Sequence, residues 1–246
     1  MTVSQHLKAI LLNSGPIVPG KQWRNVPSRS HYGEHFYPGQ FSSAERATLA
    51  AFAAATSGVD RDLHEDHEKD QWHQYAVAAA PDSVEALDMC FSAINIPSSR
   101  YSAGTHPVWY GASSEDSSQR ETAYHIKRQL LHELAGLPNK DHTGIQRCMY
   151  LAEVGLAAGV DLRPFIDHEP RLLEDGPPYP FCNEVGASAV ALSVDGLITR
   201  SKRGIGAFCV VVFDKASVKQ SRARYHYAVT VYRDGRVYIM DDLVEI

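Results

Sequence analysis

The sequence predicts an α+β fold around a mixed β-sheet, with a helix-rich segment in its N-terminal part. Up to about position 97 the chain carries amphipathic and alanine-rich stretches typical of helices. Beyond it, short apolar runs typical of strands flank helical patterns, and the last two runs enclose an Asp-Gly pair typical of a β-hairpin. A chain of 246 residues, 44% of them hydrophobic, can bury one full core. We therefore expect a single domain over residues 1–246.

The N-terminal part is predicted to be mostly helical, with one early strand. Residues 3–13 have a short amphipathic pattern, and residues 21–26 (KQWRNV) have the composition of a brief strand. Residues 42–56 begin with a Ser-Ser-Ala-Glu capping pattern and continue as an alanine-rich helix. A further amphipathic pattern covers residues 81–94. We expect helices to dominate residues 40–97.

The C-terminal part is predicted to combine two helices with several strands. Residues 117–134 form a helical pattern with one apolar face, and residues 182–193 have the small-residue composition of a packed helix. The turn at Arg233-Asp234-Gly235 predicts a hairpin. Apolar or alternating runs predict strands at 107–110, 147–156, 196–200, 208–213, 225–232 and 236–240.

Composition and charge exclude several classes of protein. The net charge of -5 argues against a dedicated nucleic-acid binder, which usually has a strong basic excess. The N-terminus lacks both the cationic flank of a signal peptide and an apolar run long enough to span a membrane, so we expect a cytoplasmic protein. The cysteines form no CxxC pair, so a structural zinc site is not expected, and two of them lie in apolar runs typical of buried free thiols: Cys148 and Cys209.

A dense run of histidines and acidic residues raises the question of a metal site. His64 and His67 lie one helical turn apart, with His73 and several carboxylates nearby. The run lacks the HExxH pattern that supplies two ligands and a general base. Since charge runs are mostly solvated faces or linkers, we expect no metal here.

Arg100, Tyr110 and Glu121 are the first candidates for an active site. They lie before a predicted strand, at its end, and in the first turns of the following helix. A strand–turn–helix unit can bring such positions to one edge of a sheet. The arginine could bind phosphate, the tyrosine could stack on a nicotinamide ring, and the carboxylate could stabilise an oxocarbenium-like charge. From spacing alone, a surface ion pair between Arg100 and Glu121, with Tyr110 in the core, is the more frequent arrangement.

Ser201 is a second candidate, at the end of the predicted strand GLITR. Lys202 and Arg203 follow it, and Arg200 precedes it. A hydroxyl flanked by cations just past a strand can hold a phosphate or a ribose. Serine in a loop between strands is common, so this residue alone indicates little.

At these positions the sequence resembles the RES-domain family. The matching pieces are SRYSAG around Arg100, VWYGAS around Tyr110, ETAYH from Glu121, and DGLITRSKRG around Ser201, followed by the apolar strand AFCVVVFD. The resemblance covers residues 20–37 and 98–240, with a helix-rich insertion at 40–97 between them. The size of this insertion, and Lys202 in place of a small apolar residue, depart from the family pattern.

The resemblance implies a fold similar to ADP-ribosyltransferases of the diphtheria-toxin type. It also implies the toxin of a toxin–antitoxin pair that breaks the nicotinamide–ribose bond of NAD by phosphorolysis or hydrolysis. NAD would be the substrate, with inorganic phosphate as a possible co-substrate and no bound cofactor. The partner would be a helix-turn-helix antitoxin, which itself would contact DNA. Two alternatives stay open: transfer of ADP-ribose to a protein, and a catalytically idle scaffold, which the large insertion at 40–97 motivates.

The resemblance also assigns roles to single residues. Arg100 and an N-terminal arginine would hold the pyrophosphate, Tyr110 would stack on nicotinamide, and Glu121 would bind the ribose and stabilise the cationic transition state. Ser201 would position phosphate or ribose. The N-terminal arginine corresponds best to Arg24, with Arg29 as its rival. Arg203 completes the expected NAD-binding set.

Overall fold

The chain divides into two compact units, each described here by itself. The computed structural model describes residues 5–27, 83–92, 96–136, 139–174, 176–239 and 242–244. The first unit consists of Met1–Arg24, Ser83–Glu121 and Leu151–Arg222, and the second of Asn25–Asp82, Thr122–Tyr150 and Ala223–Ile246. The expectation of a single domain over residues 1–246 stays a prediction. Most of the insertion expected at 40–97 lies outside the described residues.

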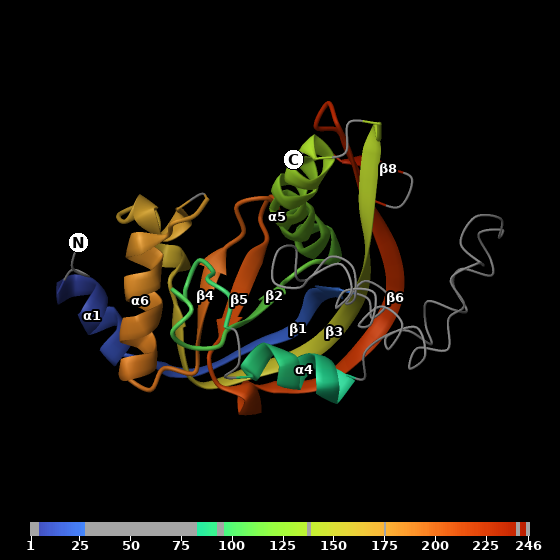
Figure 1. Ribbon diagram of the computed structural model, residues 1–246. Coiled ribbons are helices and arrows are strands. Elements are labelled where there is room, and N and C mark those ends of the chain that lie inside the picture. The colour runs from blue at the N-terminus through green and yellow to red at the C-terminus, as the bar shows by residue number, and fades with distance from the viewer. Residues whose placement is uncertain are drawn as a thin grey trace. The chain divides into compact units, whose positions relative to one another are not determined.

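The first unit is built on a mixed sheet with the strand order β1-β2-β5-β4-β3 (Figure 1). The pairs β1–β2, β2–β5 and β4–β5 are antiparallel, whereas β3 and β4 are parallel. The predicted mixed sheet and α+β class are therefore confirmed. The five strands are β1 (Gly15–Pro27), β2 (Trp109–Ala112), β3 (His142–Asp161), β4 (Gly196–Arg200) and β5 (Phe208–Val212).

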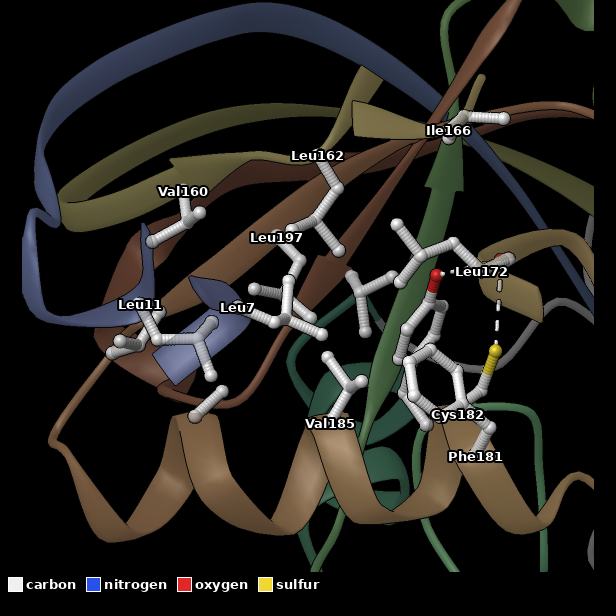
Figure 2. Packing of buried hydrophobic residues seen from close by; sticks show 14 of the residues in the cluster. Leu7, Leu11, Val160, Leu162, Ile166, Leu172, Phe181, Cys182, Val185 and Leu197 are labelled. Carbon is white, nitrogen blue, oxygen red and sulfur yellow. Dashed lines mark hydrogen bonds between the residues drawn. The ribbon is translucent and has the colours of Figure 1, made fainter. Parts of the chain in front are cut away.

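Helices cover both faces of this sheet. On one face, α6 (Pro180–Ala191) and α1 (Gln5–Leu12) pack against apolar side chains that include Leu197 and Val211 (Figure 2). On the other face, α4 (Ser83–Phe91) packs through its apolar side chains against Trp109 and its neighbours. Three short 3-10 helices complete the unit: Arg163–Phe165, Pro170–Leu173 and Lys215–Ser217.

Gly186 lets α6 lie directly on the segment that carries Arg100. A Cβ added at Gly186 would lie 1.9 Å from the carbonyl oxygen of Tyr101. We expect Gly186→Ala to lower the free energy of unfolding by about 3 kcal/mol, because backbone rather than a flexible side chain must move. Chemical denaturation measures this. Gly155→Ala is the control, since no atom lies within 4 Å of the added methyl group; equal stability of the two variants would contradict the close contact.

The second unit contains the remaining strands and most of the long helix. The first half of β3 belongs to it, and the strand order continues β3-β6-β7-β8. The predicted hairpin is present: β6 and β7 are antiparallel, and Gly235 in the turn has a positive φ of 87°. The remaining elements are α5 (Glu115–Ala135), β6 (Val218–Tyr232), β7 (Val237–Ile239) and β8 (Asp242–Val244).

The long helix α5 begins in the first unit and continues in the second. Four buried residues confirm its predicted apolar face: Ala123, Ile126, Leu130 and Leu134. Leu131, on the same predicted face, is half-buried. Among the helices of the described residues, none is long and apolar enough to cross a membrane.

Candidate active site

Strand pairing brings Tyr110 and the end of β4, which Ser201 follows, to one face of the first unit's sheet. Tyr110 of β2 lies opposite Val211 of β5. Two pairs further along, Cys209 of β5 lies between Ala112 of β2 and Thr199 of β4. Directly opposed residues share a face, and this is the face that α6 covers. Ser201 follows two residues after Thr199, at the end of β4.

Glu121 and Ser201 meet directly, although 80 residues separate them. The Ser201 hydroxyl donates to Glu121 Oε1 at 2.9 Å, and the backbone N–H of Lys202 donates to the same oxygen at 3.2 Å. Both donors come from the loop after β4, while Glu121 lies in the first turns of α5. The carboxylate is therefore held by two donors on one oxygen, and it is only half-buried.

Arg100 lies in the same electrostatic environment but makes no ion pair with Glu121. Its guanidinium carbon lies 5.9 Å from the ring centroid of Tyr179. Burial lowers the pKa of Arg100, but Tyr101, Glu121 and two cysteines together raise it by more, so the net direction is upward and the group stays charged. Its Nε is buried without a hydrogen-bond partner among the described residues. A surface ion pair with Glu121, the simpler alternative, is not what the structure shows.

The Tyr110 hydroxyl binds the segment that carries Arg100. It accepts the backbone N–H of Tyr101 at 3.0 Å and lies 3.0 Å from the Ser99 hydroxyl. Because an N–H can only donate, the tyrosine proton is available to Ser99. Burial raises the pKa of Tyr110 to about 12, although both hydrogen bonds oppose the rise, so the hydroxyl is neutral at physiological pH. Tyr110 thus fixes both neighbours of Arg100.

Comparison with known proteins gives the family. The model of the RES domain matches residues 73–231. The chain belongs to the RES-domain family. A solved structure similar to it is a chain from the crystal structure of the M. tuberculosis MbcT–MbcA toxin–antitoxin complex, with 11% identity, a TM-score of 0.41, and coverage of 90% of this chain and 93% of that one. No curated protein matches the chain.

The predicted N-terminal arginine, Arg24, lies outside the matched residues 73–231 and apart from the other predicted residues. Arg24 donates to the Tyr110 carbonyl oxygen at 2.9 Å and to Cys90 Sγ at 2.9 Å, and its guanidinium lies over the Trp109 ring. Trp109 packs on the α4 face of the sheet. Consecutive strand residues point to opposite faces, so Arg24 lies on the face opposite the Tyr110 ring. Its role with NAD stays a prediction, and its rival Arg29 lies outside the described residues.

The basic residues after β4 divide into two groups. Arg203 stays with the site, because its backbone N–H donates to Ser201 Oγ at 3.2 Å. Arg200 instead forms an exposed ion pair with Asp167 at 2.8 Å. Lys202 Nζ donates to the Leu173 carbonyl oxygen at 3.3 Å. The Arg203 charge also acts on the Cys209 thiol, so of these three cations Arg203 is the one whose side chain acts on the candidate site.

Cys209 lies on the same face of the sheet as Tyr110 and Thr199 and interacts electrostatically with the candidate site residues. Burial, and after it the Glu121 carboxylate, raises the pKa of the Cys209 thiol to about 12. Arg100, Ser201 and Arg203 act on the same thiol in the opposite direction. The sequence indicated a buried free thiol, and Cys209 is free, though part of its surface stays exposed. Alternation along β5 could have placed it on the site's face, but only once the register with β4 was known.

Ser117 is a second residue that the sequence interpretation missed. It is fully buried and donates to Ser201 Oγ at 2.9 Å. It lies four residues before Glu121 in α5, and this spacing was the signal that could have found it. No group of three or more His, Cys, Asp or Glu that could hold a metal ion occurs among the described residues. The run from His64 to His73 lies outside them.

Proposed function

We propose that this RES domain cleaves the bond between nicotinamide and ribose in NAD and is the toxin of a toxin–antitoxin pair. The direct hydrogen bond between Ser201 and Glu121 carries the proposal, together with the charge of Arg100, which acts on both Glu121 and Cys209. Membership of the RES-domain family supports it. The acceptor of the ADP-ribose group would be water or inorganic phosphate, with no bound cofactor.

Glu121 supplies the negative charge that this cleavage requires. As nicotinamide leaves, positive charge develops on the ribose, and a fixed carboxylate stabilises it. The donors from Ser201 and Lys202 both bind Oε1, and neither binds Oε2. Oε2 therefore faces the ribose in our proposal, while Oε1 fixes the orientation of the group.

Arg100 provides the complementary site for the pyrophosphate of NAD. Its charge is permanent, and its buried Nε has no partner among the described residues. An anionic phosphate oxygen would satisfy this donor, and guanidinium groups bind phosphate in a bidentate manner. Arg203 and Arg24 are further candidates for NAD binding, with Arg24 on the opposite face of the sheet.

Nicotinamide release from NAD tests the proposal. Purified, folded protein free of any antitoxin is incubated with NAD, with and without phosphate, and the products are separated by chromatography. Free ADP-ribose indicates hydrolysis, and ADP-ribose 1″-phosphate indicates phosphorolysis. Labelled NAD added to a lysate distinguishes transfer of ADP-ribose to a protein. Absence of nicotinamide release under every condition would leave an idle scaffold and refute the proposal.

The expectation of an antitoxin partner rests on membership of the RES-domain family alone. We propose a helix-turn-helix protein that blocks the active site and itself contacts DNA. Co-expression of this chain with the product of a neighbouring gene tests it, because a cognate antitoxin would relieve growth inhibition and copurify with the RES domain. Growth inhibition that no such partner relieves would contradict this part of the proposal.

Tyr110→Phe separates two roles of the tyrosine. The variant keeps the ring but leaves the Tyr101 N–H without its acceptor. We expect NAD cleavage to fall about tenfold, because one lost hydrogen bond of this kind costs about 1.5 kcal/mol, and Arg100 loses its fixed position. Steady-state kinetics measure this. Full activity of Tyr110→Phe, together with loss in Tyr110→Leu, would instead assign the tyrosine to stacking on nicotinamide.

A further inference from the structure

Ser117 and Glu121 both hydrogen-bond to Ser201, in the loop after β4, from one face of α5. They are four residues apart, so one helical turn separates them on that face. Ser117 Oγ donates to Ser201 Oγ at 2.9 Å, and Ser201 Oγ donates to Glu121 Oε1 at 2.9 Å. A chain of two hydroxyl groups therefore starts at Ser117, which is fully buried, and ends on the carboxylate.

The direction of this chain is fixed by the backbone. The N–H groups of Arg203 and Gly204 lie 3.2 and 3.0 Å from Ser201 Oγ. An amide N–H can only donate, so the Ser201 oxygen acts as the acceptor and its single proton is left for Glu121. The two consecutive N–H groups of the loop share one lone pair of this oxygen, and the Ser117 hydroxyl donates to the other, which keeps the Ser201 proton from turning toward Ser117. Successive donation also polarises and strengthens the final bond.

The loop packs closely against Ser117 at Gly204. A Cβ added at Gly204 would lie 2.5 Å from Ser117 Oγ, 2.7 Å from Ser117 Cβ and 2.8 Å from Ala207 Cβ. An added methyl group would have to displace Ser117 or Ala207, although the φ of Gly204 is not positive. The close approach of helix and loop, rather than backbone conformation, is what requires glycine at this position.

We propose that Ser117 is a positioning residue for the NAD-cleaving reaction, acting on Glu121 through Ser201. It touches no substrate; it sets the donor direction of Ser201 and thereby the orientation of the carboxylate. The inference rests on the proposed function, because the carboxylate matters for catalysis only if Glu121 faces the ribose. Its effect falls on the transition state, where the charge develops, and not on ground-state binding of NAD.

Ser117→Ala tests the inference through the kinetic constants. We expect kcat to fall about five- to tenfold, the effect of losing one hydrogen bond, while KM stays within about twofold. Ser114→Ala is the matched control, since Ser114 Oγ accepts the Ser117 N–H at 3.2 Å and its loss weakens the same end of α5 without removing the hydroxyl chain. An equal loss of kcat in Ser114→Ala would show a merely structural effect and overturn the inference.

A double-mutant cycle with Ser201→Ala gives a second, independent test. In a Ser201→Ala background, Ser117→Ala should lower kcat by less than twofold, because the group through which it acts is gone. A full five- to tenfold effect in that background would overturn the inference. If Ser117→Ala does not fold, Gly204→Ala displaces the hydroxyl instead, with Gly155→Ala as the control; unchanged kcat in Gly204→Ala would also overturn it.

Crystal structures of the wild type and Ser117→Ala keep this inference separate from the proposed function. If the wild type releases no nicotinamide, the proposed function fails, whatever Ser117 does. The structures then decide the positioning role alone. We expect Ser201 Oγ or the Glu121 carboxylate to move so that their 2.9 Å hydrogen bond is lost in the variant. An unchanged bond would overturn the role of Ser117.

Discussion

Glu121→Gln is expected to lower kcat/KM for NAD cleavage about a thousandfold. Glutamine keeps the size of glutamate and an oxygen that accepts from Ser201 and Lys202, so the loop after β4 stays in place. It removes the negative charge that stabilises the developing oxocarbenium ion, and loss of such a preorganised group typically costs about 3–4 kcal/mol. Initial rates of nicotinamide release, measured over a range of NAD concentrations, give the value.

The control for Glu121→Gln is Asp116→Asn in the same helix. The Asp116→Asn variant loses the same charge near the start of α5, but the exposed Asp116 carboxylate pairs with the half-buried Arg120 at 2.8 Å and lies outside the site. We expect its kcat/KM to stay within about twofold of wild type, because exposed ion pairs contribute little. Thermal denaturation of both variants confirms that they are folded. Glu121→Gln with full activity would refute the role of this carboxylate.

Helices, strands and turns could be predicted where a single local sequence pattern determines the structure of the segment. The period of apolar residues predicted α5 within two residues at its start and one at its end. The Asp-Gly pair predicted the β6–β7 hairpin, because a turn residue with positive φ favours glycine. The continuous apolar run predicted β5, because a buried central strand needs no alternation.

Strand length could not be predicted in the same way. The strand expected at 147–156 runs in fact from His142 to Asp161, and the one expected at 21–26 runs from Gly15 to Pro27. Both strands have more than one pairing partner in the sheet. Hydrogen bonds to neighbouring strands extend them through glycine and polar positions that a sequence pattern alone places in loops.

The site could be predicted in its residues but not in its contacts. Glu121 and Ser201 were candidates from the sequence, yet their direct hydrogen bond depends on the order β2-β5-β4, which no local pattern contains. That order also places Cys209 among them. Arg24 was also a candidate from the sequence, but it lies on the opposite face of the sheet. Successive strand residues point to opposite faces, so a shift of one residue decides on which face an arginine lies. Stacking of the Tyr110 ring on nicotinamide stays a prediction, whereas the hydrogen bonds of its hydroxyl to Ser99 and Tyr101 had no signal in the sequence.

Arg100→Lys is expected to raise KM for NAD about thirtyfold and to change kcat less. Lysine keeps the positive charge beside Glu121 but lacks the Nε donor and the planar fork that binds phosphate in a bidentate manner. Hydrogen bonds to charged groups contribute about 1.5–3 kcal/mol each, so losing the second contact to an anionic oxygen accounts for an effect of this size. The loss falls on binding because the pyrophosphate does not react in the proposed step.

Arg200→Lys is the matched control for this prediction. Arg200 lies at the end of β4, one residue before Ser201, but its guanidinium is exposed and pairs with Asp167. The same substitution there should leave KM and kcat within about twofold. A fall in kcat with unchanged KM in Arg100→Lys would instead place Arg100 at the reacting bond, where its charge would oppose the developing cation unless the pyrophosphate neutralised it. Equal values of both KM and kcat in the two variants would remove Arg100 from the NAD site.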